Sequence, residues 1–178
     1  MLDTLITSKT RIKLLMKFFL NSNSEGYLRN LSNEFGESSN AIRVELNKFE
    51  TAGLLSSKLK GNRKYFQANT THPLFSSIHN LLIKNLGIDR IIDSVIDELG
   101  GLLRVYLVGD FAKGKDSSII DLIFVGDRIN SEYLLKLIQK SEHLIGRKIR
   151  YVIFGSDEVD VYLQKKDASE YLLLWENS

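Results

Sequence analysis

The stretch Ser39–Leu55, SNAIRVELNKFETAGLL, predicts a helix that ends in a tight turn and leads into a strand. Ile42, Leu46 and Phe49 follow one another at steps of four and three residues, so they share one face of the helix, which we expect to be buried. Gly53 predicts the end of the helix, because glycine readily adopts the backbone conformation that terminates helices. The fold of the first part of the chain depends on what surrounds this helix.

The opposite face of the same helix carries Asn40, Arg43 and Asn47. Arginine can donate two hydrogen bonds to guanine, and asparagine can bond adenine in the same two-pronged way. Because the major groove of DNA admits an α-helix, this face is typical of a helix that reads base edges. Ser38 and Ser39, either of which can cap the helix, are placed with its first amides to hold a phosphate.

Two helical patterns precede this helix and a hairpin pattern follows it. The polar stretch Asn21–Gly26 predicts a loop between the first two helices, and Gly61 with Asn62 predicts a tight turn between two strands. Ser8 is a suitable N-cap for the first helix, and Gly36 can end the second. The predicted elements are helices over Ser8–Leu20, Tyr27–Phe35 and Ser39–Ala52 and strands over Leu54–Lys60 and Arg63–Ala68.

The predicted hairpin carries four cations near its turn, Lys58, Lys60, Arg63 and Lys64. Positive side chains there suit the phosphate backbone or the minor groove beside a helix that lies in the major groove. The net charge is +5 over residues 1–72 and −3 over the remaining residues, within a total of +2. This asymmetry indicates that only the front part of the chain meets a polyanion.

The order of three helices and a basic hairpin, with the run AGL at 52–54, resembles the recognition helix and wing of bacterial winged-helix repressors of the ArsR and MarR type. The resemblance covers residues 8–70 and implies binding of double-stranded DNA, with the protein acting as a homodimer on two half-sites. Metal sensing of the ArsR kind is not supported, because the chain has no cysteine and this segment has no histidine cluster. The alternative is a winged helix that contacts another protein.

The start of the chain predicts a soluble cytoplasmic protein with no membrane contact. Lys9, Arg11, Lys13 and Lys17 interrupt its apolar pattern, which is therefore neither a signal peptide nor a membrane span. The absence of cysteine fits a reducing compartment.

Residues 73–100 predict a helical linker or dimerisation segment. Pro73 can open a helix at its first position, Gly87 breaks that helix, and Gly100 with Gly101 stops the next one. Apolar residues along both helices make this segment our first candidate for contacts between subunits. The helices can instead join two domains or cover a second sheet.

Residues 101–178 predict a small α/β domain with a mixed sheet. The strand Ile119–Val125 is apolar on both faces and is expected to be central. Ser156 can cap a short helix, and the tail Tyr171–Trp175 can be a helix or a strand. The other predicted elements are strands over Leu103–Val108 and Arg147–Phe154 and a helix over Asn130–Leu144.

The stretch GDFAKGKDSSIIDLIFV, at 109–125, resembles the signature of the minimal nucleotidyltransferases, a glycine turn followed by an acidic strand. Gly109, Gly114, Ser118 and Asp121 match that signature. In that family the glycine turn holds nucleotide phosphates, and carboxylates on neighbouring strands hold two Mg²⁺ ions. The resemblance therefore implies the fold of a nucleotidyltransferase for this part of the chain.

The departures from that signature fall on the residues that carry the chemistry. Asp110 replaces the serine that follows the first glycine, so a carboxylate would face the phosphates. Ile119 replaces the first acidic ligand, and Lys148–Phe154 offers no third carboxylate. Asp121 alone is a poor Mg²⁺ site, because this ion keeps its waters unless several oxygens converge on it. We expect no catalytic residue, metal site or cofactor; the alternative is a metal held by Asp110 and Asp121.

The sequence as a whole predicts an α+β protein with a winged helix domain over 1–72, a helical linker over 73–100 and a nucleotidyltransferase-like domain over 101–178. The predicted function is that of a dimeric DNA-binding transcription regulator, not an enzyme. Its back domain would act as a sensor of a small-molecule or protein effector, or as an interaction module. The alternatives are an active Mg²⁺-dependent nucleotidyltransferase and an interaction protein of the antitoxin type.

Overall fold

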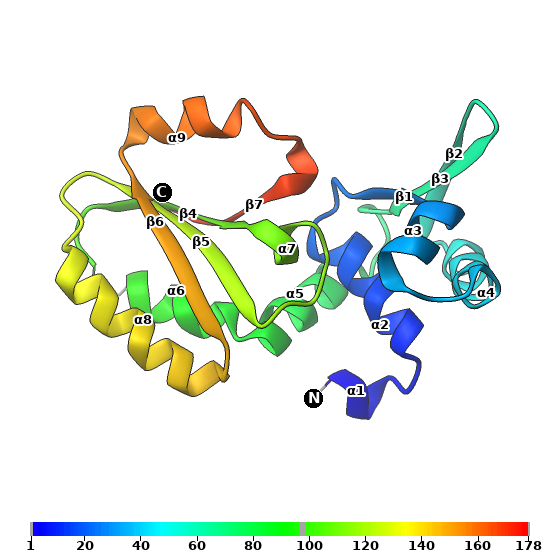
Figure 1. Ribbon diagram of the computed structural model, residues 1–178, viewed down its shortest axis with the longest axis horizontal. Coiled ribbons are helices and arrows are strands. Elements are labelled where there is room, and N and C mark those ends of the chain that lie inside the picture. Colours follow the sequence, from blue (N-terminus) through cyan, green and yellow to red (C-terminus); the bar gives the residue numbers. More distant parts are fainter. Residues whose placement is uncertain (1, 97–98, 178) are drawn as a thin grey trace. The chain divides into compact units, whose positions relative to one another are not determined.

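A computed structural model describes residues 2–96 and 99–177 (Figure 1). The chain divides into two compact units, unit 1 over Met1–Leu82 and unit 2 over Ile83–Ser178. Each unit contains one sheet with helices packed against it, so the structure is of the mixed α+β kind. The division falls inside the segment 73–100 that the sequence predicts as a linker.

Unit 1 combines helices with a small antiparallel sheet of strand order β1-β3-β2. Its last helix, α5 (Phe75–Leu86), crosses the boundary between the two units. The preceding elements are α1 (Leu2–Leu5), α2 (Lys9–Leu15), the π-helical η1 (Met16–Leu20), β1 (Glu25–Tyr27), α3 (Leu28–Phe35), α4 (Ser39–Thr51), β2 (Leu55–Lys60) and β3 (Arg63–Ala68).

The predicted helices and hairpin of unit 1 are confirmed, and their caps follow from local chemistry. The Ser38 hydroxyl accepts a hydrogen bond from the Ala41 amide at 3.2 Å, so α4 begins where its capping residue predicts. Gly36 ends α3 in the left-handed conformation, at φ 63°. Ser8 caps α2 in the same way as Ser38 caps α4. Pro73, by contrast, lies in a turn, and α5 begins two residues after it.

The strand β1 corrects the prediction at its own three residues: Glu25 and Gly26 were expected in a loop and Tyr27 in a helix, while residues 21–24 form neither helix nor strand. Glu25, Gly26 and Tyr27 pair with Gln67, Phe66 and Tyr65 of β3, which are distant in sequence. A three-residue strand held by such pairing leaves no periodic pattern in its own sequence, so periodicity could not reveal it. A Cβ at Gly26 would lie 2.8 Å from the buried Leu31 side chain, so any larger residue there would force Leu31 to shift.

The core of unit 1 is made by the apolar faces of α2, η1, α3 and α4. Its fully buried side chains include Leu14, Phe18, Phe19, Leu20, Leu31, Ile42 and Leu46. One acidic side chain, Glu45 of α4, is also buried, and Arg11 of α2 binds it through two hydrogen bonds of 2.8 and 3.2 Å. Arg11 holds the pKa of the Glu45 carboxyl below its usual value. The ion pair therefore links the first helix to α4.

We expect Arg11→Ala to lower the free energy of unfolding at neutral pH by about 1–3 kcal/mol, because it leaves a buried carboxylate with only Lys48 as a partner. A carboxyl whose pKa is lowered by folding stabilises the protein above its unfolded pKa, and this stabilisation is lost as the pH falls through the folded pKa. The decrease in the free energy of unfolding caused by Arg11→Ala should therefore become smaller below about pH 4. Urea titrations of both proteins at neutral and acidic pH measure it.

The control for this prediction is Lys84→Ala, which removes an exposed cation for which the described residues provide no carboxylate partner. A variant at Arg11 with the same loss of stability at both pH values would contradict the role given to the ion pair.

Unit 2 is built on a four-stranded sheet of order β6-β5-β4-β7. The central strands β4 and β5 are antiparallel, whereas β5 and β6 are parallel. The elements of this unit are α6 (Ile88–Ile96), β4 (Leu102–Val108), α7 (Gly109–Ala112), β5 (Ile119–Gly126), α8 (Ser131–Ile145), β6 (Lys148–Phe154), α9 (Ser156–Leu163), the 3₁₀ turn η2 (Ala168–Glu170) and β7 (Tyr171–Glu176).

The helices of unit 2 cover both faces of its sheet, with α6 and α8 on one face and α9 on the other (Figure 1). On the α9 face, Val159 and Leu163 pack against Tyr106, Ile123 and Val125. The prediction of a central β5 is confirmed, and the tail is a strand rather than a helix. The short helix is capped by Gly155, whose amide donates to the Glu158 carboxylate, and not by Ser156 as predicted.

The apolar face of α6 is not free to bind a second subunit. Ile88, Ile91, Ile92 and Val95 are all buried, and α6 packs against α8. Of the roles that the sequence left open for this helix, covering the sheet is the one that the structure supports. The predicted continuation of the helix through residues 97–98 lies outside the described residues. No helix in the described ranges is long and apolar enough to cross a membrane.

Candidate functional site

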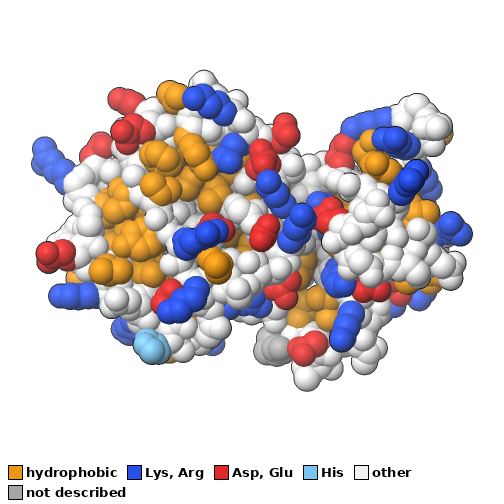
Figure 2. All heavy atoms as spheres, in the orientation of Figure 1, with side chains coloured by type: hydrophobic (Ala, Val, Ile, Leu, Met, Phe, Trp, Pro, Cys, Tyr) orange, Lys and Arg blue, Asp and Glu red, His pale blue; other side chains and the backbone are white. Residues whose placement is uncertain are grey.

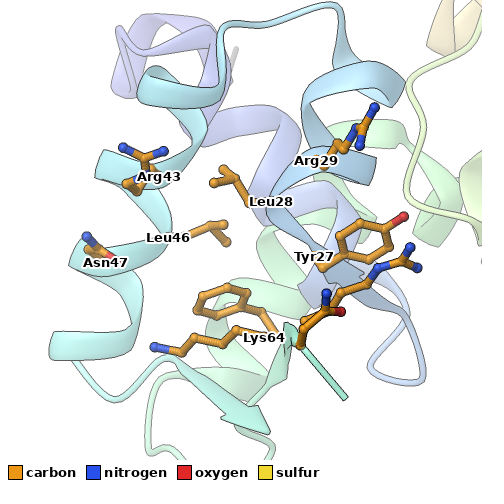
Figure 3. A pocket seen from close by; sticks show the side chains of 10 residues that line it. Tyr27, Leu28, Arg29, Arg43, Leu46, Asn47 and Lys64 are labelled. Atoms are coloured by element: carbon orange, nitrogen blue, oxygen red, sulfur yellow. The ribbon is translucent and has the colours of Figure 1, made fainter. Parts of the chain in front are cut away.

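A groove of about 480 Å³ lies in unit 1 between the start of α3, the outer face of α4 and the β2–β3 hairpin. Figure 3 shows Arg43 and Asn47 on the α4 side, Tyr27 and Arg29 on the opposite side, and Lys64 of the hairpin below them. The apolar floor is formed by Leu28, Leu46 and Phe66. Leu46, from the buried stripe of α4, thus reaches the groove, and the polar face of α4 forms one of its walls.

The charge of this groove is of one sign. Its lining includes Arg29, Arg43, Arg63 and Lys64, and no aspartate or glutamate is among the residues that line it. Arg43 and Asn47 lie one turn apart on α4, and both are exposed. Guanidinium and amide groups donate hydrogen bonds in fixed planes, which suits base edges and phosphates. The groove is therefore chemically suited to a polyanion with flat polar edges.

Aromatic rings hold the cations at the tip of the hairpin. The Arg63 guanidinium lies 4.9 Å from the centre of the Tyr27 ring, and Lys60 lies 4.9 Å from that of Tyr65. The centres of the two tyrosine rings are 5.1 Å apart, and the two residues occupy opposed positions of β1 and β3. Cation–π contacts of this kind restrict a long side chain without neutralising it. Arg63 is therefore oriented before any ligand arrives.

The three hairpin lysines that were predicted to contact phosphates are paired with carboxylates in the free chain. Lys58 and Lys60 both bind Glu25 of β1, the first at 2.6 Å, and Lys64 binds Glu50 of α4 at 2.7 Å. Lys58 and Lys60 lower the pKa of the Glu25 carboxyl, and Lys64 with Ser57 lowers that of Glu50. Of the predicted four, Arg63 alone has no carboxylate partner among the described residues.

The remaining predicted contacts lie at the other end of α4. Ser38, Ser39 and Asn40 are exposed at its first turn and do not line the groove. The Ser38 hydroxyl is engaged as the cap, and the Ser39 hydroxyl donates to that of Ser32 at 3.2 Å. The structure thus brings four predicted residues together, Arg43, Asn47, Arg63 and Lys64.

Arg29 was missed by sequence reasoning. It is the second residue of α3 and is exposed, so neither helical periodicity nor charge distinguishes it from other surface arginines. Its position gains meaning only because β1 pairs with β3 and holds the start of α3 beside the hairpin. The same pairing places Glu25 under the hairpin lysines, which is why the local sequence revealed neither residue.

Unit 2 contains the second predicted site, around Gly109 and Asp121. Gly109 adopts a positive φ of 71° where β4 leads into α7, and a Cβ there would overlap the Asp121 carboxylate. Asp121 faces Arg150 directly across the β5–β6 pair. The Arg150 Nε and Nη2 atoms donate to the two Asp121 oxygens at 2.7 and 3.1 Å, and the pair raises the pKa of Arg150. Both oxygens of Asp121 thus accept hydrogen bonds from a guanidinium.

These residues do not fit the Mg²⁺ ions that the nucleotidyltransferase resemblance implies. A magnesium site needs several converging oxygen ligands, whereas the one matching carboxylate here is bound to a cation. No group of three or more acidic or histidine residues that could hold a metal ion occurs in the described part of the chain. Asp110 and Ser118 are exposed, and Gly114 is buried beyond α7.

Comparison with family models and with curated protein sequences gives no match. Among solved structures, the reduced HlyU protein from Vibrio cholerae is similar at 16% identity, with a TM-score of 0.37, over 47% of this chain and 82% of that chain. A mutant of the toxin–antitoxin MntA–HpeT is similar at 21% identity, with a TM-score of 0.41, over 51% of this chain and 73% of that chain. Likenesses this weak define neither fold nor function.

Proposed function

We propose that this chain is a DNA-binding transcription regulator and that unit 1 is its winged helix-turn-helix domain. The order α2, β1, α3, α4 and hairpin, with β1 completing a three-stranded sheet, supports this assignment. In such a domain α4 is the recognition helix and the β2–β3 hairpin is the wing. The observation that carries the proposal is the groove between them, which is lined by cations and contains no carboxylate.

The proposed complex places the exposed face of α4 in the major groove. Arg43 and Asn47 then reach base edges, while Arg29, Arg63 and Lys64 contact the phosphate backbone on either side. Ser38, Ser39 and Asn40 at the start of α4 contact a further phosphate through the exposed polar end of that helix. Lys58 and Lys60 contribute only if they exchange Glu25 for a phosphate. Two copies binding two half-sites would multiply the affinity of a single domain.

The direct test is fluorescence anisotropy with the full chain and duplexes selected from a random pool, at two salt concentrations. Specific binding should survive a nonspecific competitor and weaken linearly in logarithmic plots as salt is raised. Failure of any duplex to bind at low salt would overturn the assignment. Equal affinity for selected and random duplexes would show that the chain binds DNA without sequence preference, and it would contradict the proposed role of Arg43.

We propose further that unit 2 is a nucleotidyltransferase-like module without catalytic activity, which serves as a sensor or as an interaction surface. The Arg150–Asp121 pair supports this, because the guanidinium competes with a metal ion for both carboxylate oxygens. A rival enzyme would transfer a nucleotide in the presence of Mg²⁺ and lose this activity in Asp121→Asn.

Calorimetric titration with Mg²⁺ and ATP should show no binding by the wild-type chain. Arg150→Ala should likewise fail to bind Mg²⁺, because the single carboxylate it frees does not replace the other missing ligands. A Glu142→Gln variant, which alters a carboxylate elsewhere in unit 2 that is bound by Lys148, is the control. Metal-dependent nucleotide transfer by the wild-type chain would show that the rival is correct.

A further inference from the structure

The outer edge of β6 in unit 2 is an apolar strand that no other strand covers among the described residues. Tyr151, Ile153 and Phe154 are half-buried, and Val152 is 42% exposed. On α9, which follows β6 in the chain, Val161 is 56% exposed. Hydrophobic side chains gather over β6 and beside α9 on the face shown in Figure 2. An uncovered apolar edge of this kind is a template for pairing with another strand.

The backbone of β6 defines which residues could pair. The Lys148 amide donates to Ser118, on the β5 side, whereas the Ile149 amide donates instead to the Glu142 carboxylate at 2.8 Å. Since successive backbone groups of a strand point to alternate edges, Tyr151 and Ile153 share the edge of Ile149. Their amides and carbonyls are therefore the groups that a further strand would meet, beyond the one amide that Glu142 already binds.

The charges at the two ends of β6 are opposite in sign. Lys148 and Arg150, near its start, each bind a carboxylate of their own chain, but their side chains are 78% and 69% exposed and still present positive charge at the edge. The first turn of α9, which follows its end, carries Asp157 and Glu158, both exposed. Two antiparallel copies of this edge would place the basic start of each strand beside the acidic end of the other. The edge is thus complementary to itself in both charge and apolar character.

We propose that two copies of this chain associate through β6, paired antiparallel about a two-fold axis at Val152. This register hydrogen-bonds Tyr151 of each copy to Ile153 of the other, and it brings the two Val152 side chains together at a non-hydrogen-bonded position. A second copy is chosen as the occupant because the edge complements itself. The inference rests on the proposed function only in that a DNA regulator reading two half-sites needs such a dimer.

The chain has no cysteine, so a single introduced cysteine reports this register. In Val152→Cys the two Cα atoms would lie about 4.5 Å apart, within the range that a disulfide spans. Mild oxidation of the full-length variant should therefore give a covalent dimer on a non-reducing gel. The control is Val161→Cys, which is more exposed than Val152 but belongs to α9 and not to the paired strand, and it should stay monomeric on the gel.

Sedimentation equilibrium of the full chain should show dimers at micromolar concentration. Val152→Lys should raise the dimer dissociation constant by about tenfold or more, because it places two like charges opposite each other. The matched control is Leu135→Lys, since Leu135 is similarly exposed at 46% but belongs to α8 and not to the paired strand. A monomeric wild type, a dimer unaffected by Val152→Lys, or equal cross-linking at position 161 would overturn the proposal.

Failure of this inference and failure of the proposed function give different results. A dimer that depends on Val152 but binds no duplex keeps the interface and removes the DNA-binding function. A monomer whose binding to a selected duplex depends on Arg43 keeps the DNA-binding function and removes the interface.

Discussion

Replacing Arg43 with alanine is expected to weaken binding to a selected duplex by about 5- to 150-fold, which corresponds to ~1–3 kcal/mol of lost base recognition. Arg43 is exposed on the face of α4 that lines the groove, one turn from Asn47. A guanidinium there can form two hydrogen bonds with a guanine edge, and alanine can form none. Competition binding with labelled duplex measures the loss.

The discriminating feature of this prediction is its dependence on sequence. Loss of a base contact should relax the preference at one or two base pairs, whereas loss of a phosphate contact should weaken all duplexes alike. Repeating the selection from a random pool with Arg43→Ala should therefore return sites that have lost one preferred position. An unchanged preference, with equal weakening of specific and random duplexes, would assign Arg43 to the phosphate backbone.

Lys48→Ala provides the matched control for Arg43→Ala. Lys48 lies on the same helix and carries the same charge, but it does not line the groove and binds Glu45 at 3.3 Å. We expect its removal to change affinity by less than about threefold, through the long-range field alone. Equal effects of the two substitutions would indicate that α4 contributes only net charge, and the proposed recognition role of the helix would then be wrong.

The sequence predicted α4 and the hairpin well because their information is local. The stripe of Ile42, Leu46 and Phe49 has the helical period, and all three side chains are buried. Ser38 supplies a cap whose hydrogen bond joins residues three positions apart. A pattern that depends only on neighbours in the chain can be detected in one sequence. The same reasoning identified Arg43 and Asn47, because a buried face determines which face remains outward.

The parts that could not be predicted depend on contacts between residues distant in sequence. Glu25 binds lysines of the hairpin more than thirty residues away, and only β1 pairing brings it there. The Arg150–Asp121 pair is set by the parallel register of β5 and β6, which the sequence does not specify. The sequence predicted that Asp121 lacks the other acidic ligands of the signature, but it gave no sign that a cation binds Asp121.

The second large effect is expected from neutralising the two carboxylates that bind the hairpin lysines. Glu25→Gln with Glu50→Gln removes the acidic partners of Lys58, Lys60 and Lys64 while preserving side-chain shape. Three cations would then be free to replace counterions on DNA. We expect affinity at low salt to rise roughly tenfold or more, and the logarithmic salt slope to steepen by up to about three.

The matched control neutralises two carboxylates that bind lysines away from the hairpin. Glu34→Gln with Glu37→Gln neutralises the carboxylates that bind Lys17 and Lys13, for the same change in net charge. Anisotropy titrations over a range of salt compare the two double variants. A comparable gain in both would mean that net charge alone sets the affinity, and no gain in either would mean that the hairpin does not approach the duplex.

The hairpin carboxylates bear on how tightly and how selectively the chain would bind. The lysines hold the pKa of Glu25 and of Glu50 below the usual value, so both remain ionised at neutral pH and compete there with phosphates for the same cations. Binding through the hairpin therefore exchanges one anion for another, and its net gain is small. Because nonspecific affinity arises mainly from such contacts, the competition lowers binding to random DNA more than binding through Arg43.

We therefore expect the Glu25 and Glu50 double variant to gain affinity for random duplexes and to lose discrimination. Discrimination is measured as the ratio of the dissociation constants for random and for selected duplexes. An unchanged ratio would show that Glu25 and Glu50 do not set specificity.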